Sequence, residues 1–165
     1  MRSLSAADHI YCNVRHKLLT MACASPKPIA CSFFGNGKIT CGESRGKVDV
    51  ISLIECVDDV TYHLKSCHLS RVKVTEYELI LARAGNFHLS HNEISKLEVC
   101  PKHRHNLGKY WRPLRTCQYP QHEGRKTTLH CKNPVNWTMA QEINDMFNTL
   151  VQVGSRKLSF AQFSI

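Results

Sequence analysis

The residues best suited to chemistry are cysteines and histidines that alternate with basic side chains in the segment CPKHRHNLGKYWRPLRTCQYPQH, residues 100–122. Cys100 and His103 form a C-x2-H pair, and Cys117 and His122 form a C-x4-H pair. Zinc prefers thiolate and imidazole ligands in tetrahedral geometry, and two short-spaced pairs can each supply half of such a site. The spacing therefore predicts a Zn²⁺ site built from Cys100, His103, Cys117 and His122.

Other histidines and cysteines leave alternatives open. His105 could replace His103, and His130 or Cys131 could replace His122. A β-hairpin turning at residues 35–37, Gly-Asn-Gly, would bring Cys31 and Cys41 near one another, because these turn residues tolerate positive φ. A second metal site could then draw on the N-terminal cysteines, although buried strand cysteines are the simpler interpretation; the candidates are Cys31, Cys41, Cys56 and Cys67.

The cysteine content favours metal binding over a disulfide framework. The chain has nine cysteines, an odd number, and its N-terminal stretch is interrupted by charged residues such as Asp8 and Arg15. No run approaches the roughly 18 apolar residues of a membrane helix, and no signal peptide is expected. A reducing compartment, and so an intracellular and nuclear location, is the expectation.

Positive charge is concentrated in one segment. Residues 100–132 hold eight Lys and Arg residues against Glu123 alone, which is +7 of a net charge of +9. Such a concentration indicates an anionic partner. Nucleic acid, and DNA in particular, is the leading candidate, since cations neutralise phosphates and release counterions. A solvated face that maintains solubility is the alternative. The candidate nucleic-acid contacts are Lys102, Arg104, Lys109, Arg112, Arg115, Arg125, Lys126 and Lys132.

Three arginines and two aromatic residues of this segment have the chemistry for more specific contacts. Arg104, Arg112 and Arg115 could bind phosphate or guanine bidentately. Tyr110 and Trp111 could stack on unpaired bases, or pack beside the metal as a small hydrophobic wall.

The segment CQYPQH, residues 117–122, resembles the C-x-x-P-x-H zinc element of the Smad DNA-binding domain and of His-Me-finger homing endonucleases. The resemblance implies that Cys117 and His122 bind metal, with Cys100 as the upstream cysteine. An active nuclease would place a general-base histidine shortly before Cys117, but residues 110–116 contain none. A wider block, with VNWTMAQEI and LVQVGS, resembles an uncharacterised Cys/His-rich domain of invertebrate proteins, which implies no known activity.

Three functions follow from these features. A zinc-stabilised, non-catalytic module that binds nucleic acid is the leading interpretation. A zinc-scaffolded adaptor that presents basic residues to an acidic protein is the alternative, and a metal-dependent nuclease is the third. The nuclease would need an open metal position near His103, His105 or Asn106.

The elements expected to position these residues give a small mixed α+β domain with a β-hairpin, several amphipathic helices and a zinc module. Apolar spacing predicts helices over residues 5–24, 50–67, 90–97 and 138–151, the last two opened by the capping boxes Ser90/Glu93 and Thr138/Gln141. Alternation predicts one or two strands over residues 71–82. A boundary near residue 90 would divide the chain into 1–89 and 90–165, unless both form one continuous domain.

Overall fold

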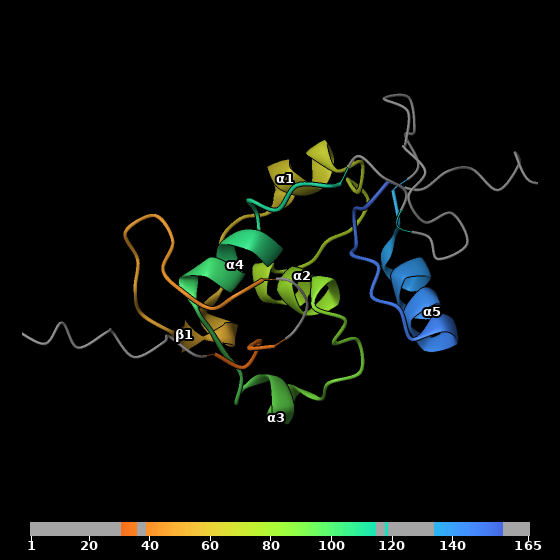
Figure 1. The fold of residues 1–165 in the computed structure, drawn as a ribbon. Helices are drawn as coiled ribbons and strands as arrows, with labels where there is room; N and C mark the ends of the chain where they lie inside the picture. The colour runs from red at the N-terminus through yellow and green to blue at the C-terminus, as the bar shows by residue number, and fades with distance from the viewer. Residues whose placement is uncertain (1–30, 36–38, 115–117, 119–133, 157–165) are drawn as a thin grey trace, which may run out of the picture.

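The computed structural model describes residues 31–35, 39–114, 118 and 134–156 (Figure 1). The described residues form short helices and one two-stranded antiparallel sheet, which confirms the α+β class. The elements in chain order are β1 (Ile51–Ser52), the 3₁₀ helix η1 (Leu53–Glu55), α1 (Thr61–Ser66), α2 (Glu76–Arg83), α3 (His91–Ile94), β2 (Glu98–Val99), α4 (Pro101–Leu107) and α5 (Trp137–Phe147).

Helix α2 is the central element, and Figure 1 shows it between α4 and α5, both of which it contacts. The strands predicted over residues 71–82 are therefore wrong. A capping box begins the helix: the Thr75 hydroxyl accepts from the Glu78 N–H, and the Glu78 carboxylate accepts from the Thr75 N–H. Nearly every side chain of α2 is buried, so the sequence lacks the polar face that marks an amphipathic helix.

Two clusters of buried apolar side chains share α2. The first cluster takes Leu79 and Ala82 from α2 and packs them against α1, Trp111 and α5. The second cluster takes Ile80 and Leu81 and packs them against η1, β2 and α4. Each cluster contains residues from before and after residue 90.

The two other capping-box predictions have different outcomes. Helix α3 follows its predicted Ser90/Glu93 capping box but ends at Ile94. Helix α5 lies where the C-terminal helix was predicted but ends at Phe147 rather than at residue 151. Of the predicted apolar stripe, Ile143 is buried, whereas Met146, Phe147 and Leu150 are exposed. The N-cap of α5 is Asn136, whose side chain accepts from the Met139 N–H, so the helix starts before the predicted Thr138.

The antiparallel strands come from distant parts of the chain. Ile51 pairs with Val99 and Ser52 with Glu98. In the expected hairpin, the described residues 31–35 and 39–42 form turns and loops without strand pairing. The helix predicted over residues 50–67 is reduced to α1, after β1 and η1. Residues 56–60 have no regular secondary structure, and the Thr61 N–H donates to the Asp59 carboxylate.

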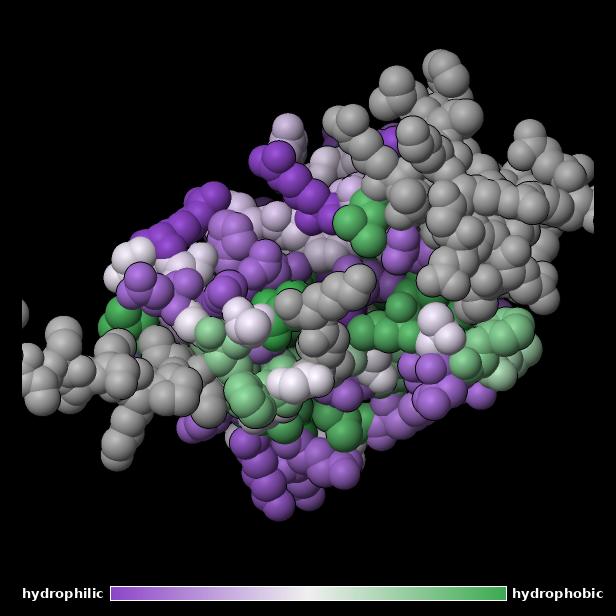
Figure 2. All heavy atoms as spheres, viewed as in Figure 1, coloured by the Kyte–Doolittle hydropathy of each residue, from purple (hydrophilic) through white to green (hydrophobic). Residues whose placement is uncertain are grey.

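The surface of the described residues is mixed. On the face in view, Figure 2 shows hydrophilic side chains along the upper left and lower edges and hydrophobic side chains through the middle. Within this part of the chain no helix has the length and apolar character needed to cross a membrane. The helix predicted over residues 5–24 lies outside the described residues.

Candidate metal centre

Three cysteines and one histidine converge at the N-terminal end of α4. The ligand atoms of Cys31, Cys41, Cys100 and His103 all lie within 4.8 Å of one another. Thiolate sulfur and imidazole nitrogen are donors typical of structural zinc, and Cys₃His is one of its common ligand sets. The four residues could therefore hold a metal ion.

Helix α4 supplies half of this cluster through its first turn. Cys100 is the N-cap, Pro101 occupies the first turn of the helix, and the Cys100 sulfur accepts from the His103 N–H at 3.5 Å. Proline suits this position because it has the required φ and lacks the N–H that would go unpaired. Positions i and i+3 share one helix face, so the Cys100 sulfur and the His103 ring point to the same side.

Backbone contacts of neighbouring residues place the other two cysteines. Next to Cys31, Ser32 exchanges two hydrogen bonds with Glu98 of β2: its N–H donates to the Glu98 carbonyl at 3.0 Å, and its hydroxyl accepts from the Glu98 N–H at 2.8 Å. Because β2 leads directly into Cys100, this contact holds Cys31 beside it.

Lys102 holds the segment that carries Cys41. Its N–H donates to the Gly42 carbonyl at 3.1 Å, and its ammonium group donates to the Thr40 hydroxyl at 2.7 Å. Thr40 and Gly42 flank Cys41, so the sulfur between them faces α4. Lys102 therefore positions the candidate metal centre.

The distances agree with the edges of a tetrahedron. A metal with bonds of about 2.3 Å to sulfur and about 2.0 Å to nitrogen separates two sulfurs by about 3.8 Å and a sulfur from nitrogen by about 3.5 Å. The Cys31 and Cys41 sulfurs are 3.6 Å apart. His103 Nδ1 lies 3.4 Å from the Cys31 sulfur, 3.6 Å from that of Cys41 and 3.2 Å from that of Cys100. One imidazole N–H cannot donate to three sulfurs, whereas a shared metal ion accounts for all the contacts.

Burial and hydrogen bonds act on the ligands in opposite directions. Burial raises the pKa of the Cys31 thiol to about 12. Burial also acts to raise the pKa of Cys100, but hydrogen bonds from the His103 and Gly42 backbone outweigh it and lower that pKa below its ordinary value. The Cys100 thiol is thus more easily converted than that of Cys31 to the thiolate that metals require.

His103 has the environment of a neutral ligand. Burial lowers its pKa below the ordinary value, although the Ile39 backbone acts in the other direction. Its Nε2 is buried and lacks a partner of normal hydrogen-bond geometry within the described structure. A ring that binds metal through Nδ1 carries its proton on Nε2, and the Ile39 backbone is a candidate group to orient the ring.

Exposure divides the cluster into two sides. Cys100 and His103 are fully buried, and the ring of Phe33 lies 6.0 Å from that of His103. Cys31 and Cys41 are half-buried. None of the described cysteines forms a disulfide.

The structure brings together only part of the site predicted from sequence. Cys100 and His103 join the cluster, with Cys31 and Cys41 as partners. Cys117 and His122, and the alternatives His130 and Cys131, lie outside the described residues, so their ligation stays a prediction. His105, the alternative to His103, instead stacks on Tyr110 with ring centroids 4.8 Å apart.

The remaining N-terminal candidates lie in the core. Cys56 belongs to the second apolar cluster, and burial raises the pKa of its thiol to about 12. Cys67 belongs to the first cluster, and burial raises its pKa also. Neither joins the group that could hold a metal ion.

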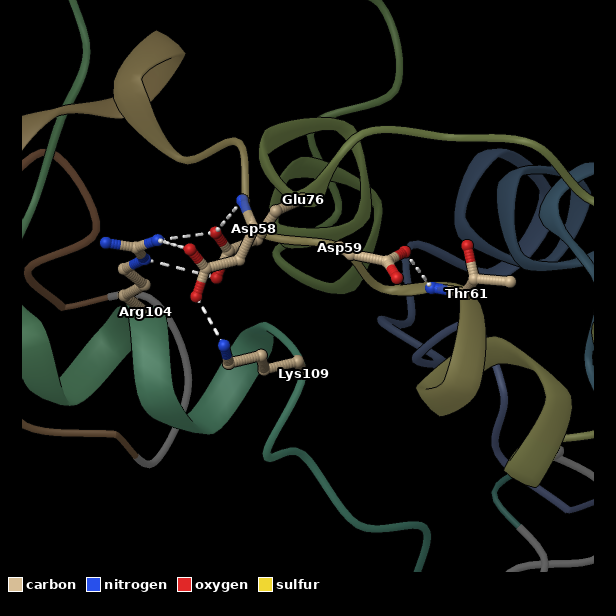
Figure 3. A network of polar contacts seen from close by, with 6 residues as sticks. All are labelled: Asp58, Asp59, Thr61, Glu76, Arg104 and Lys109. Atoms are coloured by element: carbon tan, nitrogen blue, oxygen red, sulfur yellow. Dashed lines mark hydrogen bonds and ion pairs between the residues drawn. The ribbon is translucent and has the colours of Figure 1, made fainter.

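Two of the predicted nucleic-acid contacts are engaged in an ion-pair network, which Figure 3 shows. The Arg104 guanidinium donates to both carboxylate oxygens of Glu76, at 3.1 and 2.6 Å, and lies 3.3 Å from Asp58. Lys109 donates to the other oxygen of Asp58. The Lys109 hydrogen bond lowers the pKa of Asp58, and the bond to Glu76 raises the pKa of Arg104.

The other predicted cations differ in their surroundings. Arg112 is exposed, and no ion pair joins it to another described residue. Arg115, Arg125, Lys126 and Lys132 lie outside the described residues.

The comparisons with known proteins add no relative: no protein-family model, no curated protein and no solved structure matches the chain.

Proposed function

We propose that the chain is a zinc-stabilised, non-catalytic module that binds nucleic acid, with DNA as the first candidate. The observation that carries the proposal is the place of the Cys₃His cluster. Cys100 and His103 anchor the start of α4, and the basic segment of residues 100–132 continues from that helix. A metal bound by this cluster would stabilise the beginning of the most basic segment of the chain.

The ligand set supports a structural rather than a catalytic metal. Structural zinc sites are closed by four protein ligands, whereas catalytic sites keep a position for water or substrate. The cluster already offers four protein ligands, two of them fully buried. Zinc would supply folding free energy by joining the loop of Cys31 and Cys41 to α4.

Elemental analysis of point variants tests the zinc part of the proposal. We expect Cys31→Ala and Cys41→Ala to lose the zinc of the cluster, since three ligands hold zinc less tightly than four. Cys56→Ala, at a buried cysteine outside the cluster, is the control and should retain it. Loss of this zinc in Cys117→Ala, with retention in Cys31→Ala, would overturn the Cys₃His assignment and favour the ligand set predicted from sequence spacing.

Fluorescence anisotropy with labelled DNA tests the binding part. The zinc-loaded chain should bind DNA at low salt and release it steeply as salt rises, because counterion release drives the association. Binding to polyglutamate, with no binding to DNA even at low salt, would replace this function with that of an adaptor for an acidic protein. Plasmid incubated with the chain and Mg²⁺ should stay uncut, and cutting would contradict the non-catalytic assignment.

A further inference from the structure

An open depression lies between α1, the turn of residues 44–47 and the chain that follows α4. Its volume is about 1160 Å³. Sites for single small molecules typically enclose roughly 300–1,000 Å³, so this depression has room for an extended ligand.

Positive charge dominates the residues described around the depression. Arg45, Arg83, Lys109 and Arg112 line it, although Lys109 is paired with Asp58, and Asp59 is the one acidic residue among those described there. Asp59 accepts a hydrogen bond from the Thr61 N–H at 2.9 Å. The depression therefore favours an anionic ligand.

Arg83 places a buried positive charge at the floor. It is fully buried, and it donates to the carbonyls of Val153, Leu107 and Gly108 at 2.8 to 3.0 Å, with no carboxylate partner among the described residues. Burial lowers its pKa to about 10, which still leaves it protonated at neutral pH. Carbonyl oxygens satisfy its N–H groups without cancelling its charge, so its field reaches the depression.

A stack of planar groups forms one wall. The His105 ring stacks on Tyr110, and the Arg45 guanidinium lies over the Tyr110 ring, with its central carbon 3.8 Å from the ring centroid. Arg45 is exposed and lines the depression, so its guanidinium is accessible to a ligand there. Nucleic-acid bases stack on guanidinium planes when they are unpaired.

The backbone conformation of Arg45 is strained. Ser44 and Lys47 exchange two hydrogen bonds around a two-residue turn, in which Arg45 has φ +52° and Gly46 φ +72°. Turns with positive φ at both positions favour Asn, Asp or Gly. Arginine at such a position is unusual, and backbone strain of this kind concentrates at functional sites.

Aromatic and basic groups on the other sides complete the depression. Tyr62 of α1 is 85% exposed, although a tyrosine ring gains free energy from burial. Arg112 is exposed beyond Trp111 and can reach a phosphate.

The described helices are poorly suited to the major groove of duplex DNA. Recognition there needs a helix that presents base-reading and phosphate-binding side chains on an exposed face. Helix α5 contains no Lys or Arg, the one arginine of α2 is buried, and Arg104 of α4 is paired with carboxylates. A concave wall of stacked groups instead suits bases that have left a duplex.

We propose that this depression binds single-stranded nucleic acid, with unpaired bases stacked on Arg45 and Tyr62 and phosphates beside Arg112. The inference rests on the proposed nucleic-acid-binding function and specifies its ligand class. Sequence-independent binding follows, because every base has a face on which it can stack.

The test uses the zinc-loaded full chain and a labelled oligothymidylate of about 16 nucleotides, the upper range for one small binding fold. We expect tighter binding to this strand than to a duplex of equal length. Arg45→Asn should weaken single-strand binding roughly tenfold while the melting temperature stays the same or rises, because asparagine suits the positive φ. Tyr62→Ala should weaken it roughly tenfold as well, and Tyr62→Phe should preserve it.

Arg71→Ala is the matched control, because Arg71 is exposed and is not among the residues around the depression. It should leave the Kd within about twofold, since a cation outside the binding surface neutralises no phosphate. Equal or tighter binding to duplex, or equal effects of Arg45→Asn, Tyr62→Ala and Arg71→Ala, would overturn the inference while nucleic-acid binding stands. No binding to either probe would instead overturn the proposed function itself.

Discussion

At the scale of single residues, arginines 83 and 104 are satisfied by different partners. Arg83 is surrounded by carbonyl oxygens, whereas Arg104 forms a bidentate pair with Glu76, whose side chain is only 2% exposed. A buried carboxylate left without its cation is costly, so the pair matters for stability even where its net contribution is small. Arg104 therefore belongs to the core as much as to the basic surface.

We expect Arg104→Met to lower the free energy of unfolding by about 2–4 kcal/mol, because it leaves the Glu76 carboxylate buried and unpaired. Lys109→Met removes a cation from the more exposed Asp58 and should cost less than about 1 kcal/mol. Urea unfolding of both zinc-loaded variants gives the comparison. Equal losses would show that Glu76 does not depend on Arg104.

His63 should make stability depend on pH. Burial, and then the charge of Arg83, lower its pKa from 6.5 to about 4. Between these values the unfolded chain binds a proton that the folded chain does not. The contribution of His63 is therefore complete above pH 6.5 and is lost as the pH falls toward 4.

His63 Nε2 lies 2.9 Å from a terminal nitrogen of Arg83 and accepts a hydrogen bond from it. The variant His63→Gln keeps an acceptor for Arg83 but does not titrate. We expect its urea midpoint to fall less than that of the unmodified chain between pH 7 and pH 4. This is about the pH range over which His63 is protonated in the unfolded chain but not in the folded chain. Metal ligands and carboxylates are common to both proteins, so the difference isolates His63. If the urea midpoints of the two proteins fell by the same amount with pH, the lowered pKa of His63 would be contradicted.

At the scale of elements, the capping boxes of α2 and α3 are alike in sequence but differ in what their helices bury. Helix α2 contributes to both apolar clusters, whereas α3 has no buried residue. The free energy of a cap is transmitted to the whole domain only where the helix is part of the core.

Thr75→Ala should lower the global free energy of unfolding by about 1 kcal/mol, the usual value for losing an N-cap side chain. Ser90→Ala should instead increase hydrogen exchange within α3 with little change in the global value, because α3 can open locally. Denaturant unfolding and hydrogen exchange measure the two effects. A larger decrease in the global free energy of unfolding for Ser90→Ala than for Thr75→Ala would contradict this prediction.

Local patterns predicted the elements with one apolar face. Helix α5 was found from its apolar spacing, although part of the predicted stripe is exposed, and α3 was found from its capping box. Helix α2 was missed, since it is buried on both sides and its apolar run has the appearance of strands. The Thr75/Glu78 box was a signal that could have identified it.

The same limit applies to the metal centre. The C-x2-H pair of Cys100 and His103 is a local pattern and was found, and the proximity of Cys31 and Cys41 was considered from the turn between them. Their meeting with α4 depends on hydrogen bonds from Ser32 and Lys102 to residues far along the chain. Spacing along the sequence carries no information on such tertiary contacts.

At the scale of the whole molecule, the metal centre and the first apolar cluster lie in different parts of the core. The first cluster joins α1, α2, Trp111 and α5, whereas the loop of Cys31 and Cys41 is tied to the protein through Phe33, Ser32 and α4. Removal of the metal should therefore loosen one region more than the other.

We expect a chelator to increase the rate of tryptic cleavage after Arg45 and Lys47 at least roughly tenfold. This corresponds to a decrease of about 1.4 kcal/mol in the free energy of local opening. Trp111 fluorescence should change little, because its environment is the first cluster. The same chelator added to Cys31→Ala is the control and should have no further effect on cleavage. Unchanged cleavage in the unmodified chain would indicate that the loop does not need metal.

The hydrogen bonds between Ser32 and Glu98 also bear on the order in which the chain folds. Residues 31 and 103 are 72 positions apart, so their meeting closes a long loop, whereas the turn from Cys100 to His103 forms locally. Closing such a loop costs chain entropy, and non-local contacts of this kind slow folding. If the cluster holds a metal ion, the local pair could bind it early, but the four ligands would come together only at this later step. Metal supply would then determine how often a newly made chain incorporates the segment before β1 instead of leaving it exposed to proteases.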